Sequence, residues 1–468
     1  MKLKSLLTSL AITSALTVWA DSPKYIFYFI GDGMGMGPVM AAETYNRTVL
    51  GNDTPILMMQ FPVSGACMTY SASSSVTDSA AAGTALSTGS KTKNSMLGMN
   101  ADTVAVYSMA EVLKDNGYAV GVVTSVAPDD ATPGAFYAHV PKRSQYYDIN
   151  RQFADSKVDF LAGASLRGWK DKKGNLTDVK DLYAKNNIAV LRGYDELTEA
   201  GNLQKFNKVV FLPEKPFSSN EIGYTIDSIP DAISLQDMTE VAIKYLQDKS
   251  PEKFFIMVEG GNIDHALHAN DGGAAIIEIL NFQKSIQMAY DFMLQHPDET
   301  LIVITADHDT GGMSVGNSTL RYAVDFGLFA NQKASKEMFS DYCKEQLKND
   351  DFNWEAMQKY LSDTFGFWNT VALSDEQTNA LRQEFTNTFE LRNSEDKKSL
   401  YASFNSFADN VFRLLNSQAG VGFTTGSHTG NPVPVYAAGA GAELFSNMNN
   451  NIEIPVKILK AAGYELKK

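Results

Sequence analysis

Short apolar runs rich in β-branched and aromatic residues recur along this chain of 468 residues. The four clearest are residues 24–30, 119–124, 254–258 and 301–305, which read "KYIFYFI", "AVGVVT", "FFIMV" and "LIVIT". Each is short enough to be a buried strand, and long amphipathic stretches such as residues 274–295 separate them. This alternation predicts an α/β fold, a three-layer sandwich with a large, mostly parallel central sheet flanked by helices.

Two longer segments interrupt the alternation and predict inserted subdomains. Residues 165–230 are polar and rich in Lys and Asp, with a short strand expected at 209–212. Residues 321–420 carry aromatic residues and leucines at helical spacing, which indicates helices that pack on one another. We therefore expect a single domain over residues 21–468, with insertions at 165–230 and 321–420.

Residues 1–20 have the pattern of a secretory signal peptide. Lys2 and Lys4 precede an apolar stretch, and Val18-Trp19-Ala20 resembles a cleavage site with small residues at its outer positions. A membrane anchor is the weaker interpretation, because the run is short and is broken by Thr and Ser. We expect an exported chain, periplasmic or secreted, with no membrane span after cleavage.

The chain is acidic, with 54 Asp and Glu against 40 Lys and Arg and a formal net charge of −14. This balance disfavours a nucleic-acid-binding surface and binding to anionic membranes. If the ligand is an anion, the site must supply its own positive charge, and bound metal ions are one way to do so. The two cysteines, Cys67 and Cys343, either pair or remain buried thiols, and the sequence leaves both open.

Carboxylates follow all four apolar runs. They are Asp32, Asp130, Glu259 and Asp307. In open parallel sheets the ligand site lies beyond the carboxyl ends of the strands, so we expect these side chains to converge. The glycines around Asp32, in "FYFIGDGMGMG", lack the spacing of a dinucleotide-binding loop. They instead allow a sharp turn at the end of the strand, which would let a short carboxylate reach cations.

Three motifs combine carboxylates with histidines in patterns typical of metal ligands. They are "EGGNIDHALHAND" with Asp264 and His268, "TADHDTGG" with Asp307 and His308, and "TGSHTG" with His428. Asp264 and His268 are four residues apart and would share one face of a helix. Each motif alone is more often structural. Together with the other strand-end carboxylates they form a mixed nitrogen and oxygen set that suits zinc, with an all-oxygen remainder that suits magnesium.

The sequence also offers one candidate for a nucleophile and one for an anion clamp. Ser79 follows Asp78 and opens an alanine-rich stretch of strong helix propensity, where the helix N-terminus would place partial positive charge beside its hydroxyl. From this stretch alone, a purely capping role for Ser79 is favoured. Arg143 follows Thr132 closely and has the side chain best shaped to hold two phosphate oxygens, although a lone Arg is usually a solvated surface residue.

Six motifs, in this order, resemble those of the alkaline phosphatase family of metal-dependent phosphomonoesterases. They are "IGDGMG", "TDSAAAGTA", "DATPGAFYAHVPKR", "EGGNIDHALHAN", "TADHDTGG" and "SHTG". The resemblance spans most of the chain and leaves the two insertions outside it. It implies hydrolysis of phosphate monoesters to an alcohol and inorganic phosphate, through a phosphoserine on Ser79 and with Arg143 as the phosphate clamp.

The resemblance also implies two Zn²⁺ ions and one Mg²⁺ ion. The zinc beside the nucleophile would be held by Asp32, Asp307 and His308. The second zinc would be held by Asp264, His268 and His428. The magnesium would be held by Asp32, Thr132 and Glu259, with Asp32 bridging two ions.

Two positions beside these ligands vary within the family, and here they are Asp130 and His265. Some bacterial members have Asp and Lys at these positions, whereas the animal enzymes have His at both. The mixed pair of this chain leaves the identity of the third metal open.

Two rival functions stay open at this stage. One is a phosphodiesterase of the same superfamily, which ranks second because an arginine clamp favours the doubly charged group of a monoester. The other is a non-catalytic metal-binding or phosphate-binding protein, against which the complete set of nucleophile, clamp and ligands argues. A homodimer is compatible with the resemblance.

Overall fold

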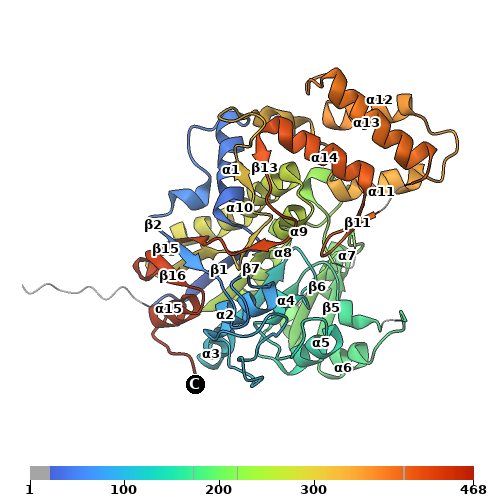
Figure 1. The fold of residues 1–468 in the computed structure, drawn as a ribbon. Coiled ribbons are helices and arrows are strands. Elements are labelled where there is room, and N and C mark those ends of the chain that lie inside the picture. Colours follow the sequence, from blue (N-terminus) through green and yellow to red (C-terminus); the bar gives the residue numbers. More distant parts are fainter. Residues whose placement is uncertain (1–21, 172, 219, 394–395, 468) are drawn as a thin grey trace, which may run out of the picture.

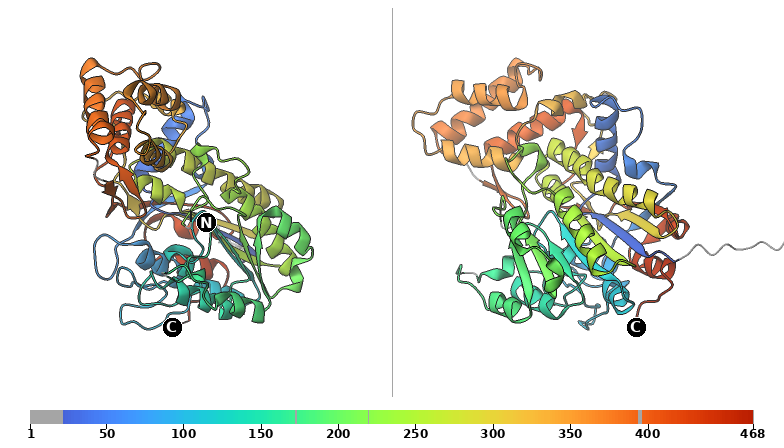
Figure 2. Two further views of the ribbon diagram at one scale, coloured as in Figure 1. Left: turned by 90° about the vertical axis from the view of Figure 1, so that its right-hand side faces the viewer. Right: turned by 180° about the vertical axis from the view of Figure 1, so that it is seen from behind.

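A ten-stranded sheet forms the centre of the computed structural model, which describes residues 22–171, 173–218, 220–393 and 396–467. The expected signal peptide, residues 1–20, lies outside the described residues. Helices flank the sheet on both faces, with α8 (Leu235–Lys249) and α10 (Gly272–Gln295) on one and α2 (Ser79–Thr88) and α3 (Met109–Asp115) on the other (Figures 1 and 2).

The strands of the sheet run in the order β16-β2-β15-β8-β1-β7-β3-β4-β6-β5. Their bounds are β1 Tyr25–Gly31, β2 Val63–Met68, β3 Ala119–Thr124, β4 Phe160–Ala162, β5 Ile188–Arg192, β6 Lys208–Leu212, β7 Phe254–Gly260, β8 Thr300–Thr305, β15 Val433–Gly439 and β16 Asn447–Asn450. Only β15 runs antiparallel to its neighbours in this sheet, β8 and β2. The predicted α/β sandwich with a mostly parallel sheet is confirmed.

The four apolar runs of the sequence are four adjacent strands, β8-β1-β7-β3. All their residues are buried, as expected for strands covered on both faces. The register places Ile30 opposite both Glu259 and Thr305, and Thr124 opposite Glu259. The strands therefore end level with one another, and the polar residues that follow them meet at one edge of the sheet.

The remaining elements connect and cover the strands. The other helices are α1 Met36–Thr48, α4 Ala131–Gly134, α5 Tyr146–Asp155, α6 Val179–Lys185, α7 Gly193–Ala200, α9 Asn262–His268, α11 Lys336–Gln346, α12 Trp354–Phe365, α13 Asp375–Phe385, α14 Ser406–Ala419 and α15 Glu453–Ala461. The short strands are β9 Asp309–Thr310, β10 Ser314–Val315, β11 Asp396–Lys398, β12 Ser403–Asn405, β13 Val421–Gly422 and β14 His428–Thr429. Across the described ranges, no helix is long and apolar enough to cross a membrane.

The two segments outside the motifs differ in structure. Residues 165–230 supply β5 and β6, which pair in parallel and continue the main sheet through β4, so this segment extends the core. Residues 321–420 contain α11 to α14 and form a helical lobe that stands to one side of the sheet (Figure 1). Cys343 lies in this lobe and Cys67 on β2, and both are buried, unpaired thiols.

Helix α10 buries a carboxyl group, that of Glu278. Its Oε1 accepts a hydrogen bond of 2.7 Å from the backbone N–H of Thr225. Burial, with smaller effects from Asp227 and Glu221, raises the pKa of Glu278 to about 7. A carboxyl whose pKa is higher in the folded than in the unfolded chain contributes stability at low pH, and this contribution is lost as the pH rises through the folded value.

We therefore expect Glu278→Gln to stabilise the protein relative to wild type increasingly between pH 5 and pH 8, by roughly 2–3 kcal/mol at the upper end. The amide keeps the acceptor for Thr225 but has no charge to bury. The measurement is the free energy of unfolding in urea at both pH values and at fixed metal concentration. Asp291→Asn, an exposed change on the same helix, is the control and should follow wild type. An E278Q effect equal at both pH values would contradict the prediction.

Candidate metal centre and nucleophile

Glycines let the loop after β1 pass very close to other carboxylates. Gly33 has a φ of +70°, and its N–H donates to Asp307 Oδ1 at 3.1 Å. A Cβ atom at this position would lie 2.8 Å from Asp264 Oδ1. A Cβ on Gly35 would lie 1.8 Å from Asp309 Oδ1. These glycines are therefore required by the crowding of acidic side chains around Asp32.

The first predicted ligand set, Asp32, Asp307 and His308, comes together at the ends of β1 and β8. His308 Nε2 lies 3.4 Å from Asp32 Oδ1 and 3.2 Å from Asp307 Oδ2. All three side chains are buried. The hydroxyl of Ser79 lies beside them, with Oγ 3.2 Å from His308 Nε2.

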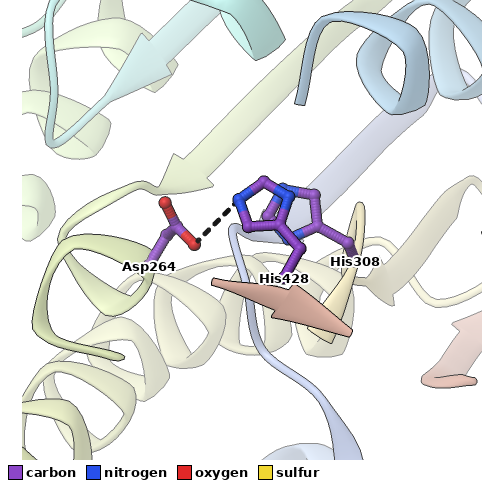
Figure 3. Close-up of side chains that lie close together, drawn as sticks. All are labelled: Asp264, His308 and His428. Carbon is purple, nitrogen blue, oxygen red and sulfur yellow. Dashed lines mark ion pairs between the residues drawn. The ribbon is translucent and has the colours of Figure 1, made fainter. Parts of the chain in front are cut away.

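The second predicted set, Asp264, His268 and His428, also converges. His268 Nε2 lies 3.3 Å from Asp264 Oδ2 and 3.0 Å from His428 Nε2. Figure 3 shows Asp264 and His428 pointing toward one another, and His428 Nε2 lies 3.9 Å from Asp264 Oδ1. The rings of His308 and His428 stack with centroids 3.6 Å apart, so the two sets adjoin.

The donor atoms of both sets are spaced as ligands of one ion would be. Two atoms about 2.0–2.1 Å from a tetrahedral zinc ion are about 3.4 Å apart. The nitrogen–oxygen distances of 3.2 and 3.4 Å in the first set are close to this value, and those in the second set are 3.3 and 3.9 Å. Asp32 Oδ1 and Asp264 Oδ2 are buried and make no hydrogen bond within the described part of the chain. Burying such oxygens is costly, and divalent cations would satisfy them.

The third predicted set comes from the loop after β1 (Asp32), from α4 (Thr132) and from β7 (Glu259). Glu259 Oε2 accepts a hydrogen bond from the Thr124 hydroxyl. Thr132 is the second residue of α4, and its Oγ1 lies 3.4 Å from Asp307 Oδ2. Thr124 was missed by the sequence analysis, although its place as the last residue of a predicted strand was a usable signal.

Burial and mutual repulsion shift the pKa values of the carboxyl groups in this site. Burial, followed by Asp307, Asp264 and Glu259, raises the pKa of Asp32 well above its usual range. Burial is also the main cause that raises the pKa of Asp307 to about 7 and that of Glu259 to about 8. Asp264 is the exception: burial alone would raise its pKa, but His268 and then His428 hold it well below its usual range. Cations bound here would neutralise the charge of these carboxylates and lower their pKa values again.

The capping residue of α2 is Asp78 and not Ser79. Asp78 Oδ1 accepts from the Ala81 N–H at 3.0 Å, and Oδ2 accepts from the Ser95 N–H at 2.8 Å. Ser79 is the first residue of the helix and is 1% exposed. Its hydroxyl is not used by the cap and faces His308, in the partial positive charge of the helix N-terminus.

Arg143 enters the site beside the nucleophile. Its Nη2 lies 3.0 Å from Asp130 Oδ1, and its Nη1 lies 3.7 Å from Asp78 Oδ2. Nη2 also donates to the Tyr401 hydroxyl at 3.5 Å. Burial alone would lower the pKa of Arg143, but Tyr401, Asp130 and Asp78 hold it above its usual range. The guanidinium is a permanently charged group in contact with Asp78, the residue before Ser79.

The two variable positions have separate partners. Asp130 pairs with Arg143 and, through Oδ2, with Arg167 Nη1 at 3.0 Å. His265 Nδ1 lies 2.6 Å from Glu221 Oε2. Arg167, Glu221 and Tyr401 were missed by the sequence analysis because they lie in the segments 165–230 and 321–420, where no motif marks them.

Several known proteins are similar to this chain over nearly its whole length. Residues 23–464 match the family model for alkaline phosphatase. Alkaline phosphatase 3 of Bacillus subtilis is 30% identical over 460 residues, which cover 96% of this chain and 90% of the relative. The crystal structure of a cold-active alkaline phosphatase from a psychrophilic Shewanella has a TM-score of 0.77 at 25% identity, covering 93% of this chain and 99% of that one. The structure of a TAB5 alkaline phosphatase variant with Mg bound in its M3 site has a TM-score of 0.65 at 24% identity. The match covers 95% of this chain and 99% of that one.

Because the carboxylates are crowded, we expect removal of one of their charges to stabilise the metal-free protein and to reduce the stabilisation that bound zinc provides. In Asp307→Asn the amide oxygen still accepts from Gly33, but one buried negative charge is gone. We expect the metal-free variant to melt above metal-free wild type, and the rise in Tm on adding zinc to be smaller than in wild type. Thermal unfolding with a chelator and with zinc measures both.

The exposed Asp298→Asn, just before β8, is the matched control and should leave both Tm values unchanged. A metal-free D307N variant that melts below metal-free wild type would show that repulsion does not dominate at this position.

Proposed function

This chain belongs to the alkaline phosphatase family, and from that premise we propose that it hydrolyses phosphate monoesters through a phosphoserine on Ser79. The observation that carries the proposal is the position of the Ser79 hydroxyl. It lies 3.2 Å from a nitrogen of the His308 imidazole and at a helix N-terminus, and the Arg143 guanidinium lies 3.7 Å from the carboxylate of the preceding residue, Asp78. A hydroxyl in this position can approach a phosphoryl group that the Arg143 guanidinium holds.

We assign Asp32, Asp307 and His308 to one Zn²⁺ ion and Asp264, His268 and His428 to a second. Asp32, Thr132 and Glu259 offer only oxygens, which suit Mg²⁺ or another ion that prefers oxygen ligands. The magnesium bound in the M3 site of the TAB5 variant supports a third ion in proteins of this fold. When bound, the divalent ions would lower the pKa of the serine hydroxyl and neutralise charge on the transferring group.

The protein side chains divide the remaining work. Arg143 holds two phosphoryl oxygens of the monoester, so that phosphorus faces Ser79. Ser79 Oγ gives up its proton and forms a bond to phosphorus while the bond to the alcohol oxygen breaks in line, and the leaving alcohol oxygen takes up one proton in exchange. Water then cleaves the phosphoserine, which releases inorganic phosphate and restores the serine hydroxyl. Asp78 holds the start of α2, and with it Ser79, in place throughout.

Export to the periplasm or the medium is a further proposal, which rests on the charged start, apolar stretch and cleavage pattern of residues 1–20. A homodimer is likewise a proposal from family resemblance.

The proposed activity is tested with the purified chain and two substrates, p-nitrophenyl phosphate and bis(p-nitrophenyl) phosphate. We expect the monoester to be hydrolysed with the higher kcat/KM, since Arg143 suits a group with two free charged oxygens. A chelator should abolish phosphate release, and zinc with magnesium should restore it. A preference for the diester would favour the phosphodiesterase alternative, and no release from either ester would favour a binding protein.

Ser79→Ala tests the covalent step separately. We expect folding and metal content to survive, because Asp78 caps the helix, while kcat falls by roughly three orders of magnitude or more. Ser90→Ala, two residues beyond the same helix, is the control and should retain wild-type turnover. Near-normal kcat in S79A would exclude Ser79 as the nucleophile.

A further inference from the structure

Two side chains outside the family motifs reach the Arg143–Asp130 pair, one from each inserted segment. We propose that Arg167 and Tyr401 are positioning residues, which together orient the Arg143 guanidinium toward the phosphate and so set the phosphate affinity of this chain. The inference rests on the proposed function, because it assumes that Arg143 holds a phosphoryl group.

Arg143 has a competing partner in Asp130. A carboxylate and a guanidinium tend to form two parallel hydrogen bonds, and such a pair would use the donors that a phosphate needs. In this structure the pair has only one short contact, 3.0 Å between Nη2 and Asp130 Oδ1. Nη1 has only a 3.7 Å contact with Asp78. The fork of Arg143 is therefore left partly free for an anion.

Arg167 accounts for the single contact. Its Nη1 lies 3.0 Å from Asp130 Oδ2, so the second carboxylate oxygen is already engaged. Asp130 Oδ1 also accepts from the Ala131 N–H at 2.7 Å, which fixes the carboxylate at the start of α4. The Arg167 guanidinium lies over the ring of Tyr146, 3.9 Å from the centroid, and is held there. Arg167 thus prevents Asp130 from forming a bidentate salt bridge with Arg143.

Tyr401 holds Arg143 from another side. Its hydroxyl accepts the 3.5 Å hydrogen bond from Nη2, the same nitrogen that contacts Asp130. Its ring packs against that of His265, with centroids 3.9 Å apart and planes tilted by 32°, and makes an edge contact with His268 at 5.3 Å. Because Glu221 fixes His265 at 2.6 Å, the tyrosine ring lies against a rigid support. The hydroxyl is therefore presented to the guanidinium at a defined position.

The turn that carries Tyr401 is anchored to both the lobe and the site. Tyr401 lies between β11 and β12, and the Asn405 N–H at the end of β12 donates to Ser340 Oγ on α11 at 2.8 Å. Ser399 Oγ donates to the carbonyl of His268 at 3.4 Å. The helical lobe is also held to the end of α9 by Lys336 Nζ, which donates to the Ala269 carbonyl at 2.7 Å. Through these contacts the position of the helical lobe determines where Tyr401 lies relative to Arg143.

The test uses Arg167→Met and Tyr401→Phe in the metal-loaded protein. R167M frees an Asp130 oxygen to pair with Arg143, and Y401F removes one hydroxyl while keeping the stacked ring. We expect each variant to raise the Kd for inorganic phosphate, measured by calorimetry, about three- to tenfold. KM for p-nitrophenyl phosphate should rise by a similar factor, and kcat should not fall by more than about threefold.

Two matched controls separate positioning from general loss of structure. Tyr342→Phe removes a hydroxyl inside the helical lobe, where Tyr342 stacks on Tyr360 at 3.9 Å. Arg151→Met removes an exposed arginine from α5 that lies over Tyr147. Both should keep the wild-type Kd.

Unchanged phosphate affinity in R167M and Y401F would overturn the inference, as would equal losses in the controls. Phosphate binding is measured without turnover, so a wild-type chain that binds phosphate but releases none from a monoester would count against the proposed function and leave this inference standing.

Discussion

Buried carboxylates crowded at the ends of four adjacent parallel strands are the constraint on which the rest of this structure depends. The strands are buried on both faces and end in register, so Asp32, Glu259 and Asp307 cannot move apart without disrupting the sheet. Burial and like charge raise the pKa of each of these groups. The histidines, the Arg143 guanidinium and the N-terminus of α2 surround these carboxylates and offset part of their negative charge.

Much of this arrangement could be predicted from the sequence because it is local. An apolar run followed by a carboxylate indicates both the strand and the edge of the sheet where its side chain lies, and Asp264 and His268 share a face by helix geometry alone. The capping role that its own stretch favoured for Ser79 is wrong. The choice between Ser79 and Asp78 as the helix cap was not visible in the sequence, since both residue types cap helices well. It depends on which oxygen reaches the Ala81 N–H, and in the structure that oxygen belongs to Asp78.

Contacts over long sequence separations could not be predicted in the same way. Arg167 and Tyr401 lie in segments without motifs, and nothing in their immediate neighbours indicates that they approach Asp130 and Arg143. Both segments were predicted to be insertions, with a short strand expected at 209–212 in the first and packed helices in the second. One continues the sheet through β5 and β6, whereas the other folds as a helical lobe, and the difference arises from strand pairing with β4.

The small ladders at the base of the helical lobe have a consequence for how this site can change over evolution. The chain leaves the sheet through β9 and β10 and returns through β13 and β14, and these strands pair as β10 with β13 and β9 with β14. His428 thereby lies opposite Thr310, two residues after His308, although the lobe separates them in the chain. Since the entropy of closing a loop grows only slowly with its length, the lobe can be lengthened, shortened or exchanged while the two histidines stay fixed. The pairing of β9 with β14, and not the length of the lobe, thus keeps the two predicted ligands His308 and His428 together.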